Sequence, residues 1–191
     1  MSGVAFHWYE NQNANWNDLD QLQQQFPKTF ILATEACEEW KGQSQHVKLG
    51  SWATFNRYAI DIIRDLNHFT AGWTDWNIAV DTRGGPNWAG NFVDAPIIVN
   101  ETGHEYYKQP IYYAMGHFSK FLVPDSVRIH HDAKGDFNNV ELTTFKRPDG
   151  GIVVIILNSN NHPISMLVND SQNGYVYVNV KAQSMQNLVW Y

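Results

Sequence analysis

The chain has 191 residues, enough for one domain or one and a half and for a sizeable buried core. With 17% charged residues, a formal net charge of −6 and no basic run, it lacks the cationic surface that nucleic-acid binding needs. The single cysteine, Cys37, cannot form an internal disulfide, and the longest apolar run, residues 152–157, is too short for a transmembrane helix.

The first half of the chain alternates strand and helix patterns. Short apolar segments with aromatic or β-branched residues predict buried strands, and apolar residues at spacings of three and four predict helices. Asn17 or Asp18 is expected to cap the first helix, which Pro27 follows. Such alternation is typical of a parallel β/α architecture. The strands are predicted over residues 3–9, 29–34 and 70–76, and the helices over residues 17–26 and 51–68.

The second predicted helix is amphipathic. Its apolar side chains lie on one face, and its charged side chains are expected mostly on the other. A long loop over about residues 77–105 follows the third strand, and residues 106–121 predict a third helix. The apolar face of the second helix holds Ala59, Ile62, Ile63 and Leu66, and the charged residues are Arg57, Asp61, Arg64 and Asp65.

The second half of the chain carries only short strand patterns. The segment Pro148-Asp149-Gly150-Gly151 predicts a hairpin turn, because glycine supplies the positive φ. Regularly spaced short strands without helices indicate an antiparallel β-sandwich. We therefore predict an α/β domain over residues 1–123, a boundary near Pro124 and an all-β domain over residues 124–191. The strands are predicted over residues 140–145, 151–157, 163–168, 175–180 and 187–190.

Polar and aromatic side chains meet where the three predicted strands of the first half end. In β/α barrels these carboxyl ends carry the active site. A flat apolar ring beside hydrogen-bonding groups suits a sugar, which has apolar C–H faces and a rim of hydroxyls. The sequence thus predicts a carbohydrate site. The three ends read His7-Trp8-Tyr9, Thr34-Glu35-Ala36-Cys37 and Thr74-Asp75-Trp76-Asn77.

Each candidate residue also has a purely structural interpretation. Glu35 is placed as a glycosidase nucleophile would be, or it is a glutamate paired with an arginine or a backbone amide. Asp75 either holds sugar hydroxyls or caps a loop. For Tyr9 the pattern alone favours an aromatic plug at the top of the sheet over a contact with the nucleophile.

The tryptophans and Cys37 are equally open. Trp8 and Trp76 are either sugar platforms or core residues, and Cys37 reads as a small buried apolar residue rather than a reactive thiol. No motif for a serine hydrolase, a nucleotide-binding loop or a zinc protease is present, and His130-His131-Asp132 is expected to be solvated. The remaining tryptophans are expected in core or loop packing: Trp16, Trp40, Trp52, Trp73, Trp88 and Trp190.

A series of motifs in a fixed order resembles the C-terminal portion of the glucosylceramidases (lysosomal acid β-glucosidases) of glycoside hydrolase family 30. The resemblance covers nearly the whole chain and weakens in the second half. It implies the last three β/α units of a (β/α)8 TIM barrel followed by an antiparallel β-sandwich. The matching segments are VAFHWY (4–9), ATEAC (33–37), LGSW (49–52), GWTDWN (72–77), GGPNW (84–88), NFVDAPIIV (91–99), YKQP (107–110) and GHFSKF (116–121), with PDG (148–150) and VVIILN (153–158) further on.

The resemblance also implies roles for single residues. Glu35 corresponds to the family's catalytic nucleophile in a retaining hydrolysis, which requires neither a metal nor an organic cofactor. Asn91 corresponds to a residue on a mobile loop beside the site. The substrate-binding residues implied in this way are His7, Trp8, Tyr9, Cys37, Asp75, Trp76 and Asn91.

The chain departs from the family in one functional respect. The family's acid/base catalyst is a glutamate in an Asn-Glu pair on an earlier barrel strand, and no glutamate of this chain lies in that context. The chain starts directly in an apolar stretch without a signal peptide, as if a longer protein had been cut. Three β/α units also leave both sheet edges unpaired. We therefore expect the 191 residues alone to be inactive.

The resemblance further implies glucosylceramide as a glycolipid substrate, cleaved to glucose and ceramide. A lysosomal or secretory location, an activator protein and an anionic membrane surface follow only from the same resemblance. Three alternatives stay open. The chain is a non-catalytic glycan- or glycolipid-binding remnant, or it belongs to an enzyme acting on β-xylosides or β-1,6-glucans, or it does not fold on its own.

Overall fold

The computed structural model describes residues 3–39 and 45–191, and the chain divides into two compact units, Met1–Met115 and Gly116–Tyr191. Each unit has a hydrophobic cluster of its own. The start of the chain at Met1 and the predicted packing of Trp40 lie outside the described residues. Among the described residues, no helix has both the length and the apolar character needed to cross a membrane.

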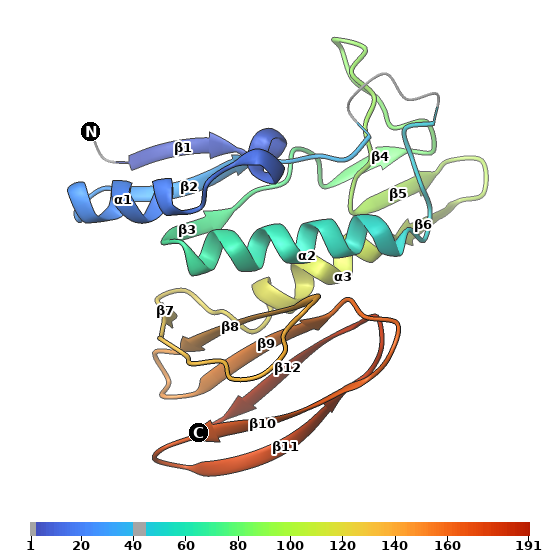
Figure 1. The fold of residues 1–191 in the computed structure, drawn as a ribbon. Helices are drawn as coiled ribbons and strands as arrows, with labels where there is room; N and C mark the ends of the chain where they lie inside the picture. Colours follow the sequence, from blue (N-terminus) through green and yellow to red (C-terminus); the bar gives the residue numbers. More distant parts are fainter. Residues whose placement is uncertain (1–2, 40–44) are drawn as a thin grey trace. The chain divides into compact units, whose positions relative to one another are not determined.

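The first unit contains a three-stranded parallel sheet in the order β1-β2-β3 (Figure 1). Helix α1 connects β1 to β2, and α2 connects β2 to β3, which confirms the predicted alternation of strand and helix. Because all three strands run in the same direction, their carboxyl ends lie at the same edge of the sheet. The elements are β1 Gly3–His7, α1 Asn17–Gln25, β2 Phe30–Glu35, α2 Trp52–Asn67 and β3 Thr70–Trp73.

The ends of these elements differ from the prediction by a few residues. β1 ends at His7 and continues as a short 3-10 helix, η1 (Trp8–Asn13), and β3 ends at Trp73. The aromatic candidates that follow therefore lie in turns just beyond the sheet. Asn17 is the first residue of α1 rather than its cap, and Trp16 occupies the cap position without a capping side chain.

Helix α2 begins after Ser51, whose Oγ accepts the Thr54 N–H at 3.3 Å, as expected for a capping serine. The apolar residues of the predicted face are buried, with Leu66 partly so, but Asp61 and Asp65, expected on the charged face, are buried as well. Helix α2 packs on more than one side, and the Asp61 carboxylate accepts the Asn11 amide of η1 at 2.8 Å. Asp65 is also fully enclosed.

The prediction of a long loop followed by a helix from residue 106 is wrong in part. This stretch contains a second three-stranded sheet, in which β4 pairs parallel with β5 and β5 pairs antiparallel with β6. Strands of three or four residues are too short to show a period in the sequence. Helix α3 begins with a proline, which fits the first turn because its missing N–H has no helical partner there. The elements are β4 Ala79–Asp81, β5 Ile97–Asn100, β6 Glu105–Lys108 and α3 Pro110–Ser119.

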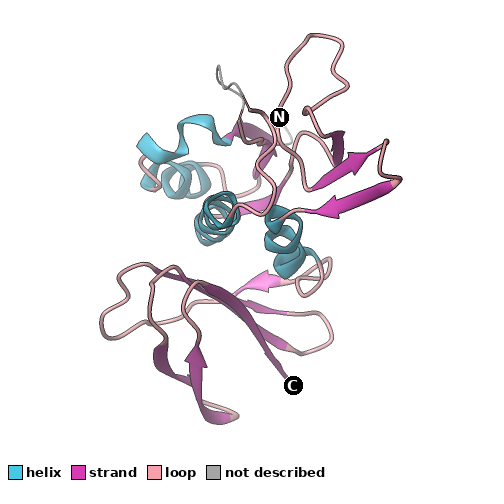
Figure 2. Ribbon diagram, turned by 90° about the vertical axis from the view of Figure 1, so that its right-hand side faces the viewer, coloured by secondary structure: helices cyan, strands magenta, loops and turns pink. Residues whose placement is uncertain are grey.

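The second unit is an antiparallel β-sandwich of a four-stranded sheet, β12-β9-β8-β7, and a two-stranded sheet, β10-β11 (Figure 2). Val154 and Ile156 of one sheet and Val178 and Val180 of the other share one buried cluster. The predicted hairpin turn is confirmed, with Gly150 at φ +90°. The strands are β7 Val127–Arg128, β8 Val140–Lys146, β9 Ile152–Asn158, β10 Ile164–Asp170, β11 Gly174–Val180 and β12 Ser184–Trp190.

Candidate functional site

Glu35 is the last residue of β2, and its side chain is 24% exposed. Tyr9 follows β1 in the chain, and its hydroxyl donates a hydrogen bond to Glu35 Oε1 at 2.9 Å. The Nδ1 atom of His7 lies 3.5 Å from the same oxygen. The structure therefore brings Glu35 together with His7 and Tyr9, from which it is separated by 26 residues or more along the chain, and it leaves the Glu35 side chain partly exposed.

Cys37 lies next to Tyr9 and is enclosed by the protein. Its Sγ is 3.2 Å from the Tyr9 hydroxyl oxygen, and its residue is 1% exposed. Burial raises the pKa of the Cys37 thiol to about 11, so the sulfur keeps its proton at neutral pH. Burial also raises the pKa of Tyr9, and the contacts with Cys37 and Glu35 add to that shift. Both groups are thus neutral donors beside a carboxylate.

Asp75 lies beyond β3 and is held by two donors. Its Oδ2 accepts the Tyr58 hydroxyl of α2 at 3.2 Å, and its Oδ1 accepts the Trp76 N–H at 2.8 Å. The Trp76 N–H is also 2.8 Å from the Ala36 carbonyl, which ties this turn to the residue after Glu35. Burial raises the pKa of Asp75 to about 7, against the two hydrogen bonds. Trp76 itself is 45% exposed.

Trp8 is mostly enclosed, at 7% exposure. Its ring packs edge-on against Tyr58 and Trp73, with centroid separations of 5.1 and 6.0 Å. The Trp73 indole N–H in turn donates to Asp61 at 2.9 Å. Trp8, Tyr58 and Trp73 thus form one aromatic cluster, and Trp76 is the more open of the two candidate indoles.

Asn91 lies in the turn segment that precedes β5. Its backbone N–H donates to Asn87 Oδ1 at 3.2 Å, and no hydrogen bond joins it to Glu35 among the described residues. The turn before it depends on Gly84, which has φ +90° and where a Cβ would lie 2.6 Å from the Val93 carbonyl oxygen. The predicted place of Asn91 beside the site therefore stays a prediction.

Tyr58, Glu38 and Asp94 lie near these candidates and were not predicted from the sequence as site residues. Tyr58 lies four residues before Ile62, so the apolar face of α2 contains it and could have pointed to it. Glu38 and Asp94 are each 1% exposed, and the Asp94 N–H donates to the Glu38 carbonyl at 3.1 Å. Burial raises the pKa of Glu38 to about 7 and raises that of Asp94. No sequence pattern marks a carboxylate that becomes buried through contacts distant in the chain.

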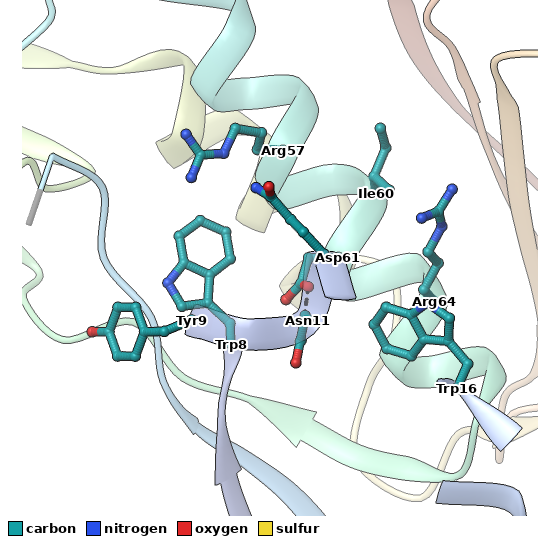
Figure 3. A pocket seen from close by; sticks show the side chains of 9 residues that line it. Trp8, Tyr9, Asn11, Trp16, Arg57, Ile60, Asp61 and Arg64 are labelled. Atoms are coloured by element: carbon teal, nitrogen blue, oxygen red, sulfur yellow. Dashed lines mark hydrogen bonds between the residues drawn. The ribbon is translucent and has the colours of Figure 1, made fainter. Parts of the chain in front are cut away.

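A pocket opens between η1 and α2, next to Trp8 and Tyr9 (Figure 3). Figure 3 shows the Arg57 side chain above the Trp8 indole, and Asp61 joined to Asn11 by a hydrogen bond. Glu35 does not line this pocket. In the part of the chain that the structure describes, no group of three or more His, Cys, Asp or Glu side chains is arranged to hold a metal ion.

The arrangement at the strand ends can support two kinds of chemistry. Glu35 presents a fixed carboxylate oxygen, which can act as a nucleophile. Asp75 and the exposed ring of Trp76 offer a hydrogen-bond acceptor and an apolar face, which together suit a sugar ring. Because these groups come from the ends of β2 and β3, neighbouring strands of one sheet, they face the same side of the unit.

Two family models match the chain. The glycosyl hydrolase family 30 TIM-barrel domain matches residues 1–122, and the glycosyl hydrolase family 30 beta sandwich domain matches residues 125–188. The first match alone covers more than half of the chain. The two compact units divide after Met115. The domain boundary predicted near Pro124 stays a prediction.

Several curated proteins are similar to the chain. Putative glucosylceramidase 3 of Caenorhabditis elegans is 42% identical over 189 residues, which cover 98% of this chain and 36% of that protein. Lysosomal acid glucosylceramidase of Mus musculus is 38% identical over 191 residues, covering 100% of this chain and 37% of that protein. The chain thus spans a little over one third of the length of these relatives.

Solved structures share the fold. The crystal structure of SrfJ from Salmonella typhimurium superposes with a TM-score of 0.87 at 25% identity and covers 100% of this chain and 41% of that chain. The endo-β1,6-glucanase BT3312 gives a TM-score of 0.82 at 21% identity, with coverage of 100% and 41%. The second likeness concerns the fold alone.

Proposed function

The chain belongs to glycosyl hydrolase family 30, and from this premise we propose that it carries the nucleophile side of a retaining β-glucosidase site, with Glu35 as the nucleophile. The observation that supports this role most directly is the Tyr9 hydroxyl bound to Glu35 Oε1 at 2.9 Å. The hydrogen bond fixes one oxygen of a carboxylate at the carboxyl end of a barrel strand, where glycosidase nucleophiles lie.

In this mechanism the Glu35 carboxylate attacks the anomeric carbon of a β-glucoside and forms a covalent glycosyl-enzyme. A second carboxylic acid, about 5–5.5 Å from the first, protonates the leaving oxygen and later activates water. Asp75 accepts hydrogen bonds from sugar hydroxyls, and Trp76 packs against the sugar ring. His7, Trp8, Tyr9 and Cys37 shape the surroundings of the nucleophile, and Asn91 contributes from the adjacent loop. The reaction needs no metal or organic cofactor.

The proposed substrate is glucosylceramide, cleaved to glucose and ceramide. Support comes from the glucosylceramidase names of the relatives that are 38% and 42% identical. The name of the mouse relative also supports a lysosomal location. An activator protein and an anionic membrane surface belong to the same proposal as partners, because a glycolipid must be presented to the site from a bilayer.

We propose that the 191 residues alone do not turn over an ordinary glucoside. No other glutamate of the chain lies in the context of the family's acid/base residue, so the leaving oxygen would depart without protonation. A leaving group that departs without protonation removes this requirement. This difference makes the nucleophile testable by itself.

The test is covalent labelling by 2,4-dinitrophenyl 2-deoxy-2-fluoro-β-glucoside. The dinitrophenolate leaves without acid assistance, and the fluorine slows hydrolysis of the glycosyl-enzyme. We expect mass spectrometry to find one 2-deoxy-2-fluoroglucosyl group on Glu35, whereas Glu35→Gln stays unlabelled and Glu101→Gln, an exposed control, labels normally. Absence of label on Glu35 in the folded chain would refute the assignment.

A non-catalytic glycan-binding role is favoured by one observation, the 45% exposure of Trp76 beside Asp75. Binding of glucosides without any labelling would support it. Action on a β-1,6-glucan is the alternative within the enzyme class, and the 24% identity to Endo-1,6-beta-D-glucanase BGN16.3 of Trichoderma harzianum makes it worth testing, together with β-xylosides. Labelling by the matching fluorinated xyloside in preference to the glucoside would favour that alternative.

A further inference from the structure

Glu38 is a buried carboxylate three residues beyond Glu35. Its Oε2 lies 3.0 Å from Nη1 of Arg57, while its Oε1 is buried with no hydrogen-bond partner among the described residues. Burial raises the pKa of Glu38 to about 7, and the charge of Arg57 opposes that shift. The ionised form of Glu38 is therefore stabilised mainly by the Arg57 guanidinium beside it.

Arg57 makes a second contact, with the indole of Trp8. Its guanidinium carbon lies 5.5 Å from the Trp8 ring centroid, and Figure 3 shows the side chain above the ring. A guanidinium can meet a carboxylate with its edge and an aromatic ring with its face at the same time. The 47% exposed Arg57 side chain thus bridges Trp8, just after β1, and Glu38, just after β2.

The two segments joined by this bridge also contain the two residues of the hydrogen bond to the candidate nucleophile. Tyr9 follows Trp8 directly, and Glu35 precedes Glu38 by three residues. The next residue of α2, Tyr58, donates its hydroxyl to Asp75 at 3.2 Å. One turn of α2 therefore contacts the segments that follow all three strands of the parallel sheet.

We propose that Arg57 is a positioning residue of the glycosidase site, which holds Trp8 and Glu38 together so that the Tyr9 hydroxyl meets Glu35. This inference rests on the proposed role of Glu35 as nucleophile. Arg57 does not touch the sugar; it acts through the two segments that it bridges. A displacement of a reacting group by one ångström can lower a rate by about a hundredfold, so a loosened bridge lowers the rate of attack.

The labelling reaction of Glu35 measures this effect without the acid/base residue. For Arg57→Gln we expect the maximal labelling rate to fall by about tenfold, with a smaller change in the half-saturating reagent concentration, because Asp75 and Trp76 remain. Arg57→Lys keeps the charge beside Glu38 but loses the planar face, so its rate should be intermediate. Arg64→Gln, two turns further along α2, is the matched control and should label at the wild-type rate.

A double variant separates positioning from stability. Glu38→Gln combined with Arg57→Gln removes the buried carboxyl group that Arg57→Gln leaves without its partner, and should restore thermal stability relative to Arg57→Gln. The bridge to Trp8 is still missing, so labelling should stay slow. Wild-type labelling of either Arg57→Gln or the double variant would overturn the proposal.

The only cysteine of the chain gives a second measurement that does not depend on glycosidase chemistry. Cys37 is buried and lies 3.2 Å from the Tyr9 hydroxyl, so its reaction with a thiol reagent reports on the order of the same contact. Arg57→Gln and the double variant should react about tenfold faster than wild type, and Arg64→Gln should not. If wild type is not labelled at Glu35, the proposed function fails, and an unchanged thiol rate in Arg57→Gln would then overturn the positioning role as well.

Discussion

Asp65 on α2 makes the stability of the chain depend on pH. The residue is fully buried, and neither carboxylate oxygen has a hydrogen-bond partner among the described residues. Burial, with a further contribution from Asp61, raises the pKa of Asp65 from its ordinary value of 3.8 to about 8. Between these two values the folded protein holds a proton that the unfolded chain has released.

The unfolding free energy must therefore fall as the pH rises, because the folded state binds more protons than the unfolded state. The slope is about 1.4 kcal/mol per pH unit where the two states differ by one full proton. From pH 5 to pH 7 the loss due to Asp65 is about 2–3 kcal/mol. Asn at this position cannot ionise, although a buried amide without partners costs about 1–3 kcal/mol at every pH.

The assay is urea denaturation of wild type and Asp65→Asn at pH 5 and pH 7, followed by circular dichroism. The variant should gain about 2–3 kcal/mol on wild type between the two pH values, whatever its stability at pH 5. Asp18→Asn, an exposed change in the same unit, should keep a constant difference from wild type. A pH-independent difference between Asp65→Asn and wild type would mean that Asp65 is already ionised in the folded protein, and would refute the reasoning.

Three further predictions concern the site and the sandwich. Tyr9→Phe removes the hydrogen bond to Glu35 and should slow labelling by the fluorinated glucoside about tenfold; an unchanged rate would show that the hydroxyl is dispensable. Trp76→Ala should weaken glucoside binding in calorimetry about tenfold, whereas Trp88→Ala, at a residue that is 99% exposed, should not. Ile156→Ala empties a fully buried position of β9 and should destabilise the sandwich by about 2–5 kcal/mol in a calorimetric scan; a loss below 1 kcal/mol would contradict the packing described.

Local patterns in the sequence were sufficient to locate the three parallel strands of the first unit to within a few residues. Apolar runs located β2 and the region of β1, and parallel pairing then brought Tyr9 and Glu35 to one edge. The five longer strands of the sandwich were found for the same reason, because each carries several apolar positions. These strands can be predicted because their apolar residues form a pattern within a few consecutive residues.

The failures have a common cause in contacts between distant segments. Asp61 and Asp65 have ionisable side chains, yet packing around α2 encloses them. Likewise, the pairing of Glu38 with Arg57 joins two elements 19 residues apart, and neither residue has a local signal for it. The short strands β4 to β6 exist because they pair with each other, since three or four residues show no period alone.

The contacts of Tyr9 also give the hydrogen bonds at the strand ends a fixed direction. An ionised Glu35 can only accept hydrogen bonds, so the Tyr9 hydroxyl must use its single proton to donate to Glu35. The Tyr9 oxygen then offers only lone pairs to Cys37, and the thiol must be the donor across the 3.2 Å contact. Donation therefore has one direction throughout, from the Cys37 thiol to the Tyr9 hydroxyl and from that hydroxyl to the Glu35 carboxylate. If oxidation or alkylation removed the hydrogen of the Cys37 thiol, lone pairs of the sulfur and of the Tyr9 oxygen would face each other. The resulting repulsion would disturb the hydrogen bond from Tyr9 to Glu35 Oε1, an atom that the sulfur does not contact.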